Sequence, residues 1–390
     1  MSSKTKTNAT KEDATPALVP KLRFPEFREA GEWVVRQFDD LFVVGNGRDY
    51  KHLEPGDVPV FGSGGYMLSV KDYLYDGESV CIGRKGTIDK PMFLTGRFWT
   101  VDTLFFTHSF AHCLPRFIFS VFQQIDWSSH NEAGGVPSLS KTNIQRIKTL
   151  VPSLPEQARI ADCLSSLDEL LAAQARKVEA LKTHKKGLME QLFPREGETQ
   201  PRLRFPEFQD AGEWEEKKLG DVVTSFKTGK LDANAMVENG KYRFYTCAKN
   251  YFQIDNYAFE GEALLVAGNG AHLGYIHHYI GKFNAYQRTY VLQRFDANVV
   301  FLRCLLERYL PSRILLEKKD GNTPYIVLST LTEMPLVVPQ NPAEQARIAD
   351  CLTSLDELIA AEAHTHEALK THKKGLMQQL FPSPQAVEHP

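Results

Sequence analysis

The sequence of 390 residues lacks any apolar run close to the ~20 residues that a membrane-spanning helix needs. Only six cysteines are present and none forms a C-x-x-C pair, which argues against a disulfide scaffold and predicts reduced thiols in a cytoplasmic protein. The first twenty residues have no apolar core, so we do not expect a secretory signal. With 46 Lys and Arg against 48 Asp and Glu, the net charge of −2 excludes a basic coat over the whole chain but not a basic face.

The sequence also lacks the common catalytic signatures. It contains no P-loop, no H-E-x-x-H, no Cys/His cluster with zinc spacing and no G-x-S-x-G. The glycine-rich stretch 268–274 lacks the spacing of a nucleotide-binding loop, and His277 and His278 are more typical of surface or core histidines than of a metal site. We therefore expect no catalytic residue, no metal and no cofactor in this chain.

What the chain does have is a long repeat that occurs twice. Residues 20–33 return as residues 201–214, at an offset of 181, and residues 156–194 return as residues 344–382, at an offset of 188. In the second pair, 32 of the 39 positions are identical. Two long copies are typical of a fused pseudo-dimer and not of a solenoid.

The middles of the two halves, residues 45–150 and 230–337, share only sparse landmarks, so the halves are alike in scaffold and different in surface. Short apolar runs between Gly-rich turns predict strands, and helical spacing predicts helices over 115–125 and 298–310. The middles are therefore mixed α/β. The predicted strands are 58–61, 79–82, 93–95, 264–267 and 290–292, and the matched landmarks are Gly83 with Gly268, 96–98 with 281–283, and 134–137 with 321–324.

Each repeated segment after a middle is predicted to be one long helix. Ser153 with Glu156, and Asn341 with Glu344, have the spacing of a capping box, and a Phe-Pro pair ends both copies. About 37 residues give a rod of ~55 Å. Apolar residues at alternating spacings of four and three predict that the copies pair as an antiparallel coiled coil.

The helix seam contains both apolar and polar positions. Polar residues there could fix the register of the pair, and the alternative is that they are tolerated in exposed stretches. The polar positions are Gln174, Lys185, Glu362, His366 and Lys373. The apolar positions are Ile160, Leu164, Leu167, Leu171, Val178, Leu181, Leu188 and Leu192, and Ile348, Leu352, Leu355, Ile359, Leu369, Leu376 and Leu380.

Residues with the chemistry to bind a ligand lie in polar, Gly-rich loops at matching places in the two middles. Arg and Asn have forked groups that pair with guanine and adenine edges. The alternative is that these loops are ordinary solvated turns. The candidate DNA-binding residues are Arg84, Lys85, Thr87, Ser138, Lys141 and Asn143 in the first half, and Lys227, Lys230, Lys249, Asn250, Asn269, His272 and Tyr325 in the second.

The lead-in Leu22–Trp33 with its copy Leu203–Trp214, the opening E-Q-A-R-I-A of each long helix and the segment Gly135–Leu139 resemble the specificity subunit of type I restriction–modification systems. The resemblance covers nearly the whole chain. It implies a non-catalytic subunit whose two target-recognition domains each read one half of a bipartite, non-palindromic DNA site. It also implies that the paired helices set the spacer between the half-sites and dock two methyltransferase subunits.

The resemblance implies an α/β (α+β) fold of two globular domains separated by the antiparallel helices, with an internal pseudo-two-fold repeat. The expected partners are double-stranded DNA, methyltransferase subunits and restriction/translocase subunits. S-adenosylmethionine, ATP and Mg are expected in those subunits and not in this chain. The expected divisions are a disordered tail (1–19), recognition domain 1 (20–152), spacer helix 1 (153–194), a linker with recognition domain 2 (195–338), spacer helix 2 (339–382) and a C-terminal tail (383–390).

Two other classes of function compete with this one. A non-catalytic coiled-coil scaffold with two protein- or glycan-binding domains would explain the helices, but not the divergent polar loops at matched positions. A two-lobed enzyme with a cleft between its halves would need a paired acid/base constellation, and the sequence shows none.

Overall fold

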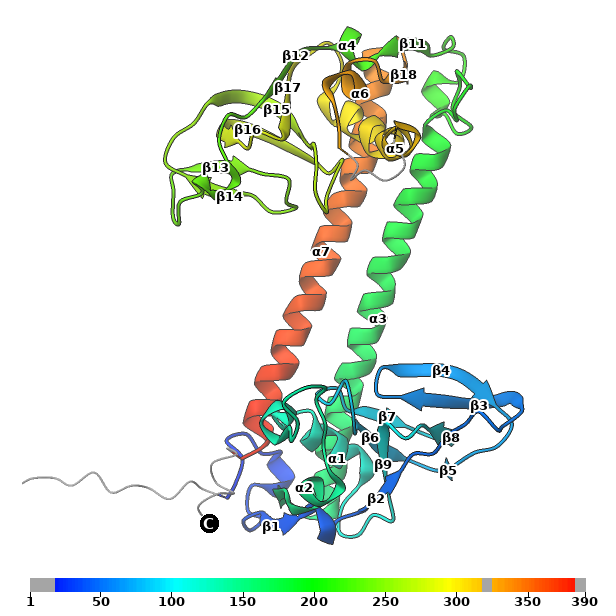
Figure 1. Cartoon of the computed structure of the whole chain (residues 1–390), viewed down its shortest axis with the longest axis vertical. Coiled ribbons are helices and arrows are strands. Elements are labelled where there is room, and N and C mark those ends of the chain that lie inside the picture. The colour runs from blue at the N-terminus through cyan, green and yellow to red at the C-terminus, as the bar shows by residue number, and fades with distance from the viewer. Residues whose placement is uncertain (1–17, 318–324, 383–390) are drawn as a thin grey trace, which may run out of the picture. The chain divides into compact units, whose positions relative to one another are not determined.

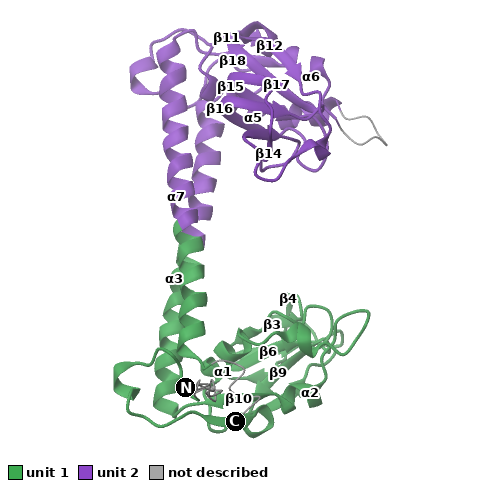
Figure 2. Ribbon diagram, turned by 90° about the vertical axis from the view of Figure 1, so that its left-hand side faces the viewer, with its two compact units in different colours: residues 1–174, 365–390 green, residues 175–364 purple. Residues whose placement is uncertain are grey.

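The computed structural model describes residues 18–317 and 325–382, and the chain forms two compact units. Unit 1 comprises residues 1–174 and 365–390, and unit 2 comprises residues 175–364 (Figure 2). Figure 1 labels the helices and strands of both units. Each unit contains one globular domain and a segment of each long helix. The expected C-terminal tail (383–390) lies outside the described residues, and so does the expected N-terminal tail except for residues 18 and 19. The predicted match between 134–137 and 321–324 is not described in its second member, 321–324.

In unit 1 the lead-in strand β1 (Val34–Gln37) pairs antiparallel with β10 (Lys148–Val151), which leads into the long helix α3 (Leu154–Leu192). Between them lie two four-stranded sheets, ordered β2-β9-β6-β7 and β4-β3-β8-β5. Helix α1 (Pro115–Phe122) packs on β6 and β7, and the short helix α2 (Lys141–Arg146) precedes β10. The remaining elements are η1 (Pro25–Phe27), η2 (Phe38–Asp40), β2 (Val43–Asn46), β3 (Pro55–Gly62), β4 (Gly65–Val70), β5 (Tyr75–Asp76), β6 (Ser79–Gly83), β7 (Met92–Leu94), β8 (Arg97–Thr100), β9 (Leu104–His108) and η3 (Trp127–His130).

In unit 2 the equivalent lead-in strand β11 (Glu215–Lys218) pairs antiparallel with β18 (Pro335–Val338), which leads into α7 (Pro342–Leu380). A single six-stranded sheet lies between them, ordered β12-β17-β15-β16-β13-β14. Helices α5 (Val299–Glu317) and α6 (Leu328–Thr332) follow the sheet. The remaining elements are η4 (Pro206–Phe208), α4 (Leu219–Val222), β12 (Val223–Thr228), η5 (Ala233–Ala235), β13 (Tyr242–Tyr245), β14 (Phe252–Ile254), β15 (Phe259–Ala267), β16 (Ile276–Ala285) and β17 (Thr289–Phe295).

The two domains share one frame. The order β2-β9-β6-β7 corresponds to β12-β17-β15-β16, with antiparallel neighbours in both, and each frame ends in a helix, a short helix and a closing strand. The differences lie in β3, β4, β5 and β8 of unit 1 and in β13 and β14 of unit 2. The predicted α/β class and the duplicated scaffold are therefore confirmed. Helix α5 extends beyond the predicted end at residue 310 and continues past Pro311.

The same trio of aromatic rings joins each domain to the helices. In unit 1 the rings of Trp33, Phe117 and Phe381 lie with centroids 5.5 to 6.0 Å apart. In unit 2 Trp214, Phe301 and Phe193 lie 5.5 to 6.4 Å apart. Each trio takes one ring from the lead-in, one from the helix on the sheet and one from the end of the long helix that started in the other half of the sequence. Such ring pairs add to the stability gained from burial alone.

Within each unit the two long helices run antiparallel. In unit 1 Asp168 of α3 accepts from Lys373 of α7 at 2.5 Å, and in unit 2 Asp356 of α7 accepts from Lys185 of α3 at 2.6 Å. The two pairs join equivalent residues of the repeat, with the roles of the two helices exchanged. Every apolar seam position is buried or half-buried. The antiparallel pairing is thereby confirmed inside each unit.

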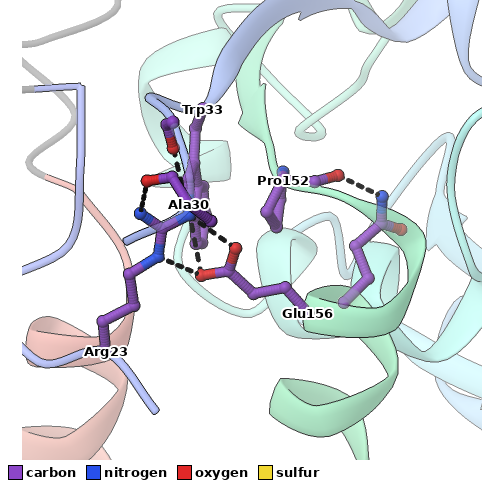
Figure 3. A network of polar contacts seen from close by, with 7 residues as sticks. Arg23, Ala30, Trp33, Pro152 and Glu156 are labelled. Carbon is purple, nitrogen blue, oxygen red and sulfur yellow. Dashed lines mark hydrogen bonds and ion pairs between the residues drawn. The ribbon is translucent and has the colours of Figure 1, made fainter. Parts of the chain in front are cut away.

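A buried carboxylate anchors each domain to the first turn of its helix, and Figure 3 shows the one in unit 1. Glu156, 1% exposed, accepts from Arg23 Nε and Nη2 at 2.7 Å each and from Trp33 Nε1 at 3.3 Å. These hydrogen bonds raise the pKa of the Arg23 guanidinium. In unit 2, Glu344 makes the same contacts with the equivalent Arg and Trp, at 2.7, 2.8 and 3.2 Å.

The capping-box prediction is therefore wrong for the two glutamates. Asn341 does cap α7, since its Oδ1 accepts from the backbone of Ala343 at 3.0 Å. The carboxylates of Glu156 and Glu344 instead bind the lead-in arginines. A guanidinium offers two charge-assisted hydrogen bonds in a buried place, which stabilise a carboxylate more than one backbone N–H does.

We predict that Glu156→Gln destabilises the chain by about 3 kcal/mol or more, because it leaves a nearly buried guanidinium without its anion. Glu344→Gln should have a similar effect in unit 2. The matched control is Glu26→Gln, which removes an exposed ion pair with Arg159 at 3.2 Å and should cost less than about 1 kcal/mol. Thermal unfolding of the three variants measures the difference. Equal effects of the Glu156 and Glu26 variants would contradict the anchoring role.

The seam ion pairs give a second prediction. Asp168→Lys should place two ammonium groups together and lower the free energy of unfolding by roughly 2 to 4 kcal/mol. The expected loss is smaller than for a fully buried pair, because Asp168 is half exposed and solvent screens its charge. Adding Lys373→Asp should recover most of that loss. Asp356→Lys with Lys185→Asp should recover less, because Arg303 also donates to Asp356, at 3.0 Å. Unfolding midpoints of the single and double variants test this, and equal recovery in both units would refute it.

Candidate nucleic-acid interface

The loop after β6 carries the first group of candidate residues in unit 1. It runs over 84–87 beside the segment that precedes α2. The backbone of Lys85 forms a β-bridge with that of Ser138, and Leu139 donates its N–H to the carbonyl oxygen of Arg84 at 2.9 Å. The structure therefore brings Arg84, Lys85, Thr87 and Ser138 together, with both cations exposed.

The other two candidates of unit 1, Lys141 and Asn143, lie in the first turn of α2, shortly after Ser138. Lys141 opens this helix, and the hydroxyl of Ser140 accepts from the backbone N–H of Asn143 at 3.2 Å. Burial first, and then the charge of Lys141, lower the pKa of His108 at the end of β9. Lys141 and Asn143 are half-buried, so they are less available to a ligand than the loop cations.

In unit 2 the loop after β15 carries Asn269 and His272. Ile326 donates its N–H to the carbonyl oxygen of Gly268 at 2.9 Å, which places Tyr325 beside this loop. Tyr290 supports the same segment, since its hydroxyl donates to the carbonyl of Ile326 at 2.9 Å. The side chain of Tyr325 is 60% exposed.

Backbone hydrogen bonds define which loop positions are equivalent. Arg84 donates to the carbonyl of Thr103 at 2.8 Å, and Gly268 donates to the carbonyl of Arg288 at 2.9 Å. Arg84 thus occupies the place of Gly268, and the predicted match of Gly83 with Gly268 is one residue out of register. Consequently Lys85 in unit 1 stands where Asn269 stands in unit 2.

The remaining candidates of unit 2 gather around the turn 286–288 between β16 and β17. The N–H of Gln287 donates to the carbonyl of Leu231, the residue after Lys230, at 2.9 Å. The thiol of Cys247 donates to the carbonyl of Arg288 at 3.5 Å. Lys230, with Lys249 and Asn250 in the turn after β13, therefore lies around the same point as the Asn269 loop. Lys227 is exposed further back along β12.

Two exposed arginines in these groups were missed from the sequence. Arg48 follows Gly47 after β2, as Lys230 follows Gly229 after β12. A Cβ on either glycine would lie 1.9 or 1.7 Å from a backbone carbonyl oxygen, so only glycine fits. The Gly-basic pair at an offset of 182 was a usable signal for Arg48. The first half has no arginine or lysine that matches Arg288 in the sequence. Its place in the interface is recognised only from the hydrogen bonds that its carbonyl accepts from Gly268 and Cys247.

Each interface therefore presents cations and forked polar groups on rigid backbone. In the part of the chain that the structure describes, five exposed loop cations form no ion pair with a carboxylate. They are therefore available to an anionic ligand. These cations are Arg48, Arg84 and Lys85 in unit 1, and Lys230 and Arg288 in unit 2.

The described residues contain no group of three His, Cys, Asp or Glu that could hold a metal ion. Burial raises the pKa of the Cys81, Cys113 and Cys304 thiols to about 12, so these thiols are poor nucleophiles. None of the described helices is long and apolar enough to cross a membrane.

The two domains thus share a duplicated frame and carry different basic loops at matched places. A family model for the type I restriction modification DNA specificity domain matches the chain twice, over residues 30–183 and 211–371. The chain therefore belongs to this family.

Individual relatives agree with the family. The specificity subunit of the type I restriction enzyme EcoDI from Escherichia coli is 40% identical over 159 residues, which are 40% of this chain and 34% of that subunit. The MjaVIII specificity subunit from Methanocaldococcus jannaschii is 23% identical over 350 residues, which are 79% of this chain and 77% of that one. The match thus spans about a third of the E. coli subunit and most of the M. jannaschii subunit.

Solved structures have the same fold. The crystal structure of a type I restriction-modification S subunit from M. genitalium gives a TM-score of 0.68 at 19% identity, covering 94% of this chain and 99% of that one. A chain from a study of complex assembly and conformational transition of the type I R-M system gives 0.53 at 14% identity, covering 90% and 98%.

Proposed function

We propose that this chain is the non-catalytic DNA specificity subunit of a type I restriction–modification complex, and that each domain reads one half of a bipartite, non-palindromic site. One observation carries the proposal: two equivalent backbone positions hold Arg84 and Lys85 in unit 1, but Gly268 and Asn269 in unit 2. Base edges are distinguished by forked donors and acceptors, so different side chains at one position read different bases.

The proposed partners are two methyltransferase subunits, with restriction/translocase subunits joining them. The repeated surfaces support two copies of one partner. The ion pair Glu26–Arg159 and its copy Glu207–Arg347 have the same length, 3.2 Å, and similar exposure, with each side chain about half exposed. Similar exposed surfaces in the two halves favour two copies of one partner. S-adenosylmethionine, ATP and Mg would belong to those subunits, and the complex would act in the cytoplasm.

A non-catalytic scaffold that binds proteins or glycans through its two domains is the alternative. It would use the same helices and the same aromatic trios. It offers no reason for unpaired cations at matched loops, or for their exchange against amide and phenol groups in the second domain. DNA binding accounts for both.

Methylation mapping is the direct test. The chain is co-expressed with its methyltransferase subunits in a host without this modification, and methylated bases are mapped across the genome. A split, non-palindromic motif methylated on both halves is expected. A complex that assembles but binds no duplex DNA and methylates none would support the scaffold instead.

Substitutions in the two interfaces should act on separate halves of that motif. Arg84→Ala with Lys85→Ala should relax or abolish recognition of one half-site, costing about 1 to 3 kcal/mol per lost base contact. Asn269→Ala with Tyr325→Ala should affect only the other half. Each double variant is the control for the other in the same mapping experiment. A change in both half-sites from either variant would contradict independent reading.

Helix length should set the spacer. Four residues inserted both after Gln174 and after His364 lengthen each rod by about 6 Å at the boundary of the two units. The spacer should grow by about two base pairs, at ~3.4 Å each, with unchanged half-sites. Four residues inserted after Gly197, between the repeats, should leave the spacer unchanged. An active complex with the original spacer would show that partner subunits position the domains.

A further inference from the structure

Unit 2 contains a second basic group that belongs to neither loop interface. It lies on β13, β14 and β16, at the far side of the six-stranded sheet order from β12 (Figure 1). The residues surround a hollow of about 420 Å³, which we call the arginine hollow. Its lining consists of Lys241, Tyr242, Arg243, Tyr251, Gln253, Tyr279 and Lys282.

Three tyrosines contact Arg243 in this hollow. Its guanidinium carbon lies 4.3 Å from the ring centroid of Tyr251 and 4.6 Å from that of Tyr279. Its Nη1 donates to the hydroxyl of Tyr245 at 3.4 Å. Cation–π contacts of this kind engage the guanidinium through its face, whereas its N–H donors lie along its edge, where an anionic ligand can pair with those that Tyr245 does not use.

The backbone is shaped to allow this stacking. Arg243 pairs with Gln253 across β13 and β14, which fixes the side of the sheet on which it stands. Gly281 has a φ of 144°, and a Cβ there would lie 2.8 Å from the hydroxyl of Tyr279. The positive φ favours glycine at this position, and its missing Cβ lets the Tyr279 ring lie close to the backbone there.

Two lysines add charge around the same hollow. Lys241 Nζ lies 5.5 Å from the ring centroid of Tyr242, and Lys282 Nζ lies 4.7 Å from that of Tyr257. Among the described residues, the only carboxylate paired with any of the three cations is Glu260, 3.9 Å from Lys282. The hollow therefore has a net positive charge and phenolic hydroxyls that can donate hydrogen bonds.

Unit 1 has no equivalent of this group within its described residues. Its nearest likeness is Arg97, which lies 4.9 Å from the ring of Tyr73. That guanidinium is already paired with Asp76 at 3.1 Å, so its charge is compensated. Among the residues that the structure describes, the arginine hollow is thus found only in the second domain.

We propose that the arginine hollow binds a backbone phosphate of the DNA flanking the half-site read by the second domain. This rests on the proposed function. A planar guanidinium edge matches two phosphate oxygens, and several converging cations fit an anion better than the neutral edge of a base. Phosphate contacts position a protein on the duplex and carry no sequence information, so the hollow adds affinity and register on one side only.

The test uses the full chain assembled with its methyltransferase subunits and a duplex that contains the mapped site. Arg243→Ala should weaken binding about tenfold for specific and unrelated duplexes alike, and should reduce the slope of log K against log salt by about one. Arg243→Lys should lose part of the affinity but keep the slope. Arg97→Ala in unit 1 is the matched control and should change neither quantity.

Folding of each variant is checked by its unfolding midpoint. If Arg243→Ala does not fold, Lys241→Gln with Lys282→Gln, both exposed, must give the reduced slope. Unchanged affinity and slope in folded variants would overturn the proposal. So would an altered methylated motif, because it would make Arg243 a reader of bases. Failure of the proposed function itself would be seen separately, as a wild-type complex that neither binds nor methylates DNA.

Discussion

The buried carboxylate at the first turn of each long helix is the interaction on which the arrangement of each unit rests. Glu156 and Glu344 are each about 1% exposed, and a carboxylate so buried is stable only when donors surround it. Both donors, an arginine and a tryptophan, come from the lead-in, more than 120 residues earlier. The tryptophan also belongs to the aromatic trio, so one cluster joins lead-in, domain helix and both long helices.

A frame held in this way leaves the loops free to differ. The contacts that place Arg84 against Leu139, and Gly268 against Ile326, are hydrogen bonds between backbone groups. Such bonds form with almost any side chain, because every residue except proline carries the same donor and acceptor. Side chains in the loops can therefore change without loss of their position. This separation explains how one scaffold carries two unlike interfaces in a single chain.

The sequence predicted the elements whose signals are local. The seam period, the helix ends and the duplicated scaffold are visible in short windows and in comparison of the two halves. The local spacing predicted a capping box at Glu156. The residue that binds this carboxylate, Arg23, is 133 residues away, so local spacing could not indicate it. The arginine hollow was also missed, since β13, β14 and β16 come together only through strand pairing. Local spacing cannot show which distant side chains meet.

The near-zero net charge is consistent with a DNA-binding protein once its distribution is known. Many of the carboxylates compensate cations inside the frame: Glu156 and Glu344 bind the lead-in arginines, and Asp168 and Asp356 bind the seam lysines. The loop cations have no such partners among the described residues. Overall charge sums both populations, whereas a DNA phosphate interacts mainly with the nearby unpaired one, because salt screens charges beyond about 10 Å. A neutral chain can thus present basic surfaces where its acids are committed to holding the fold.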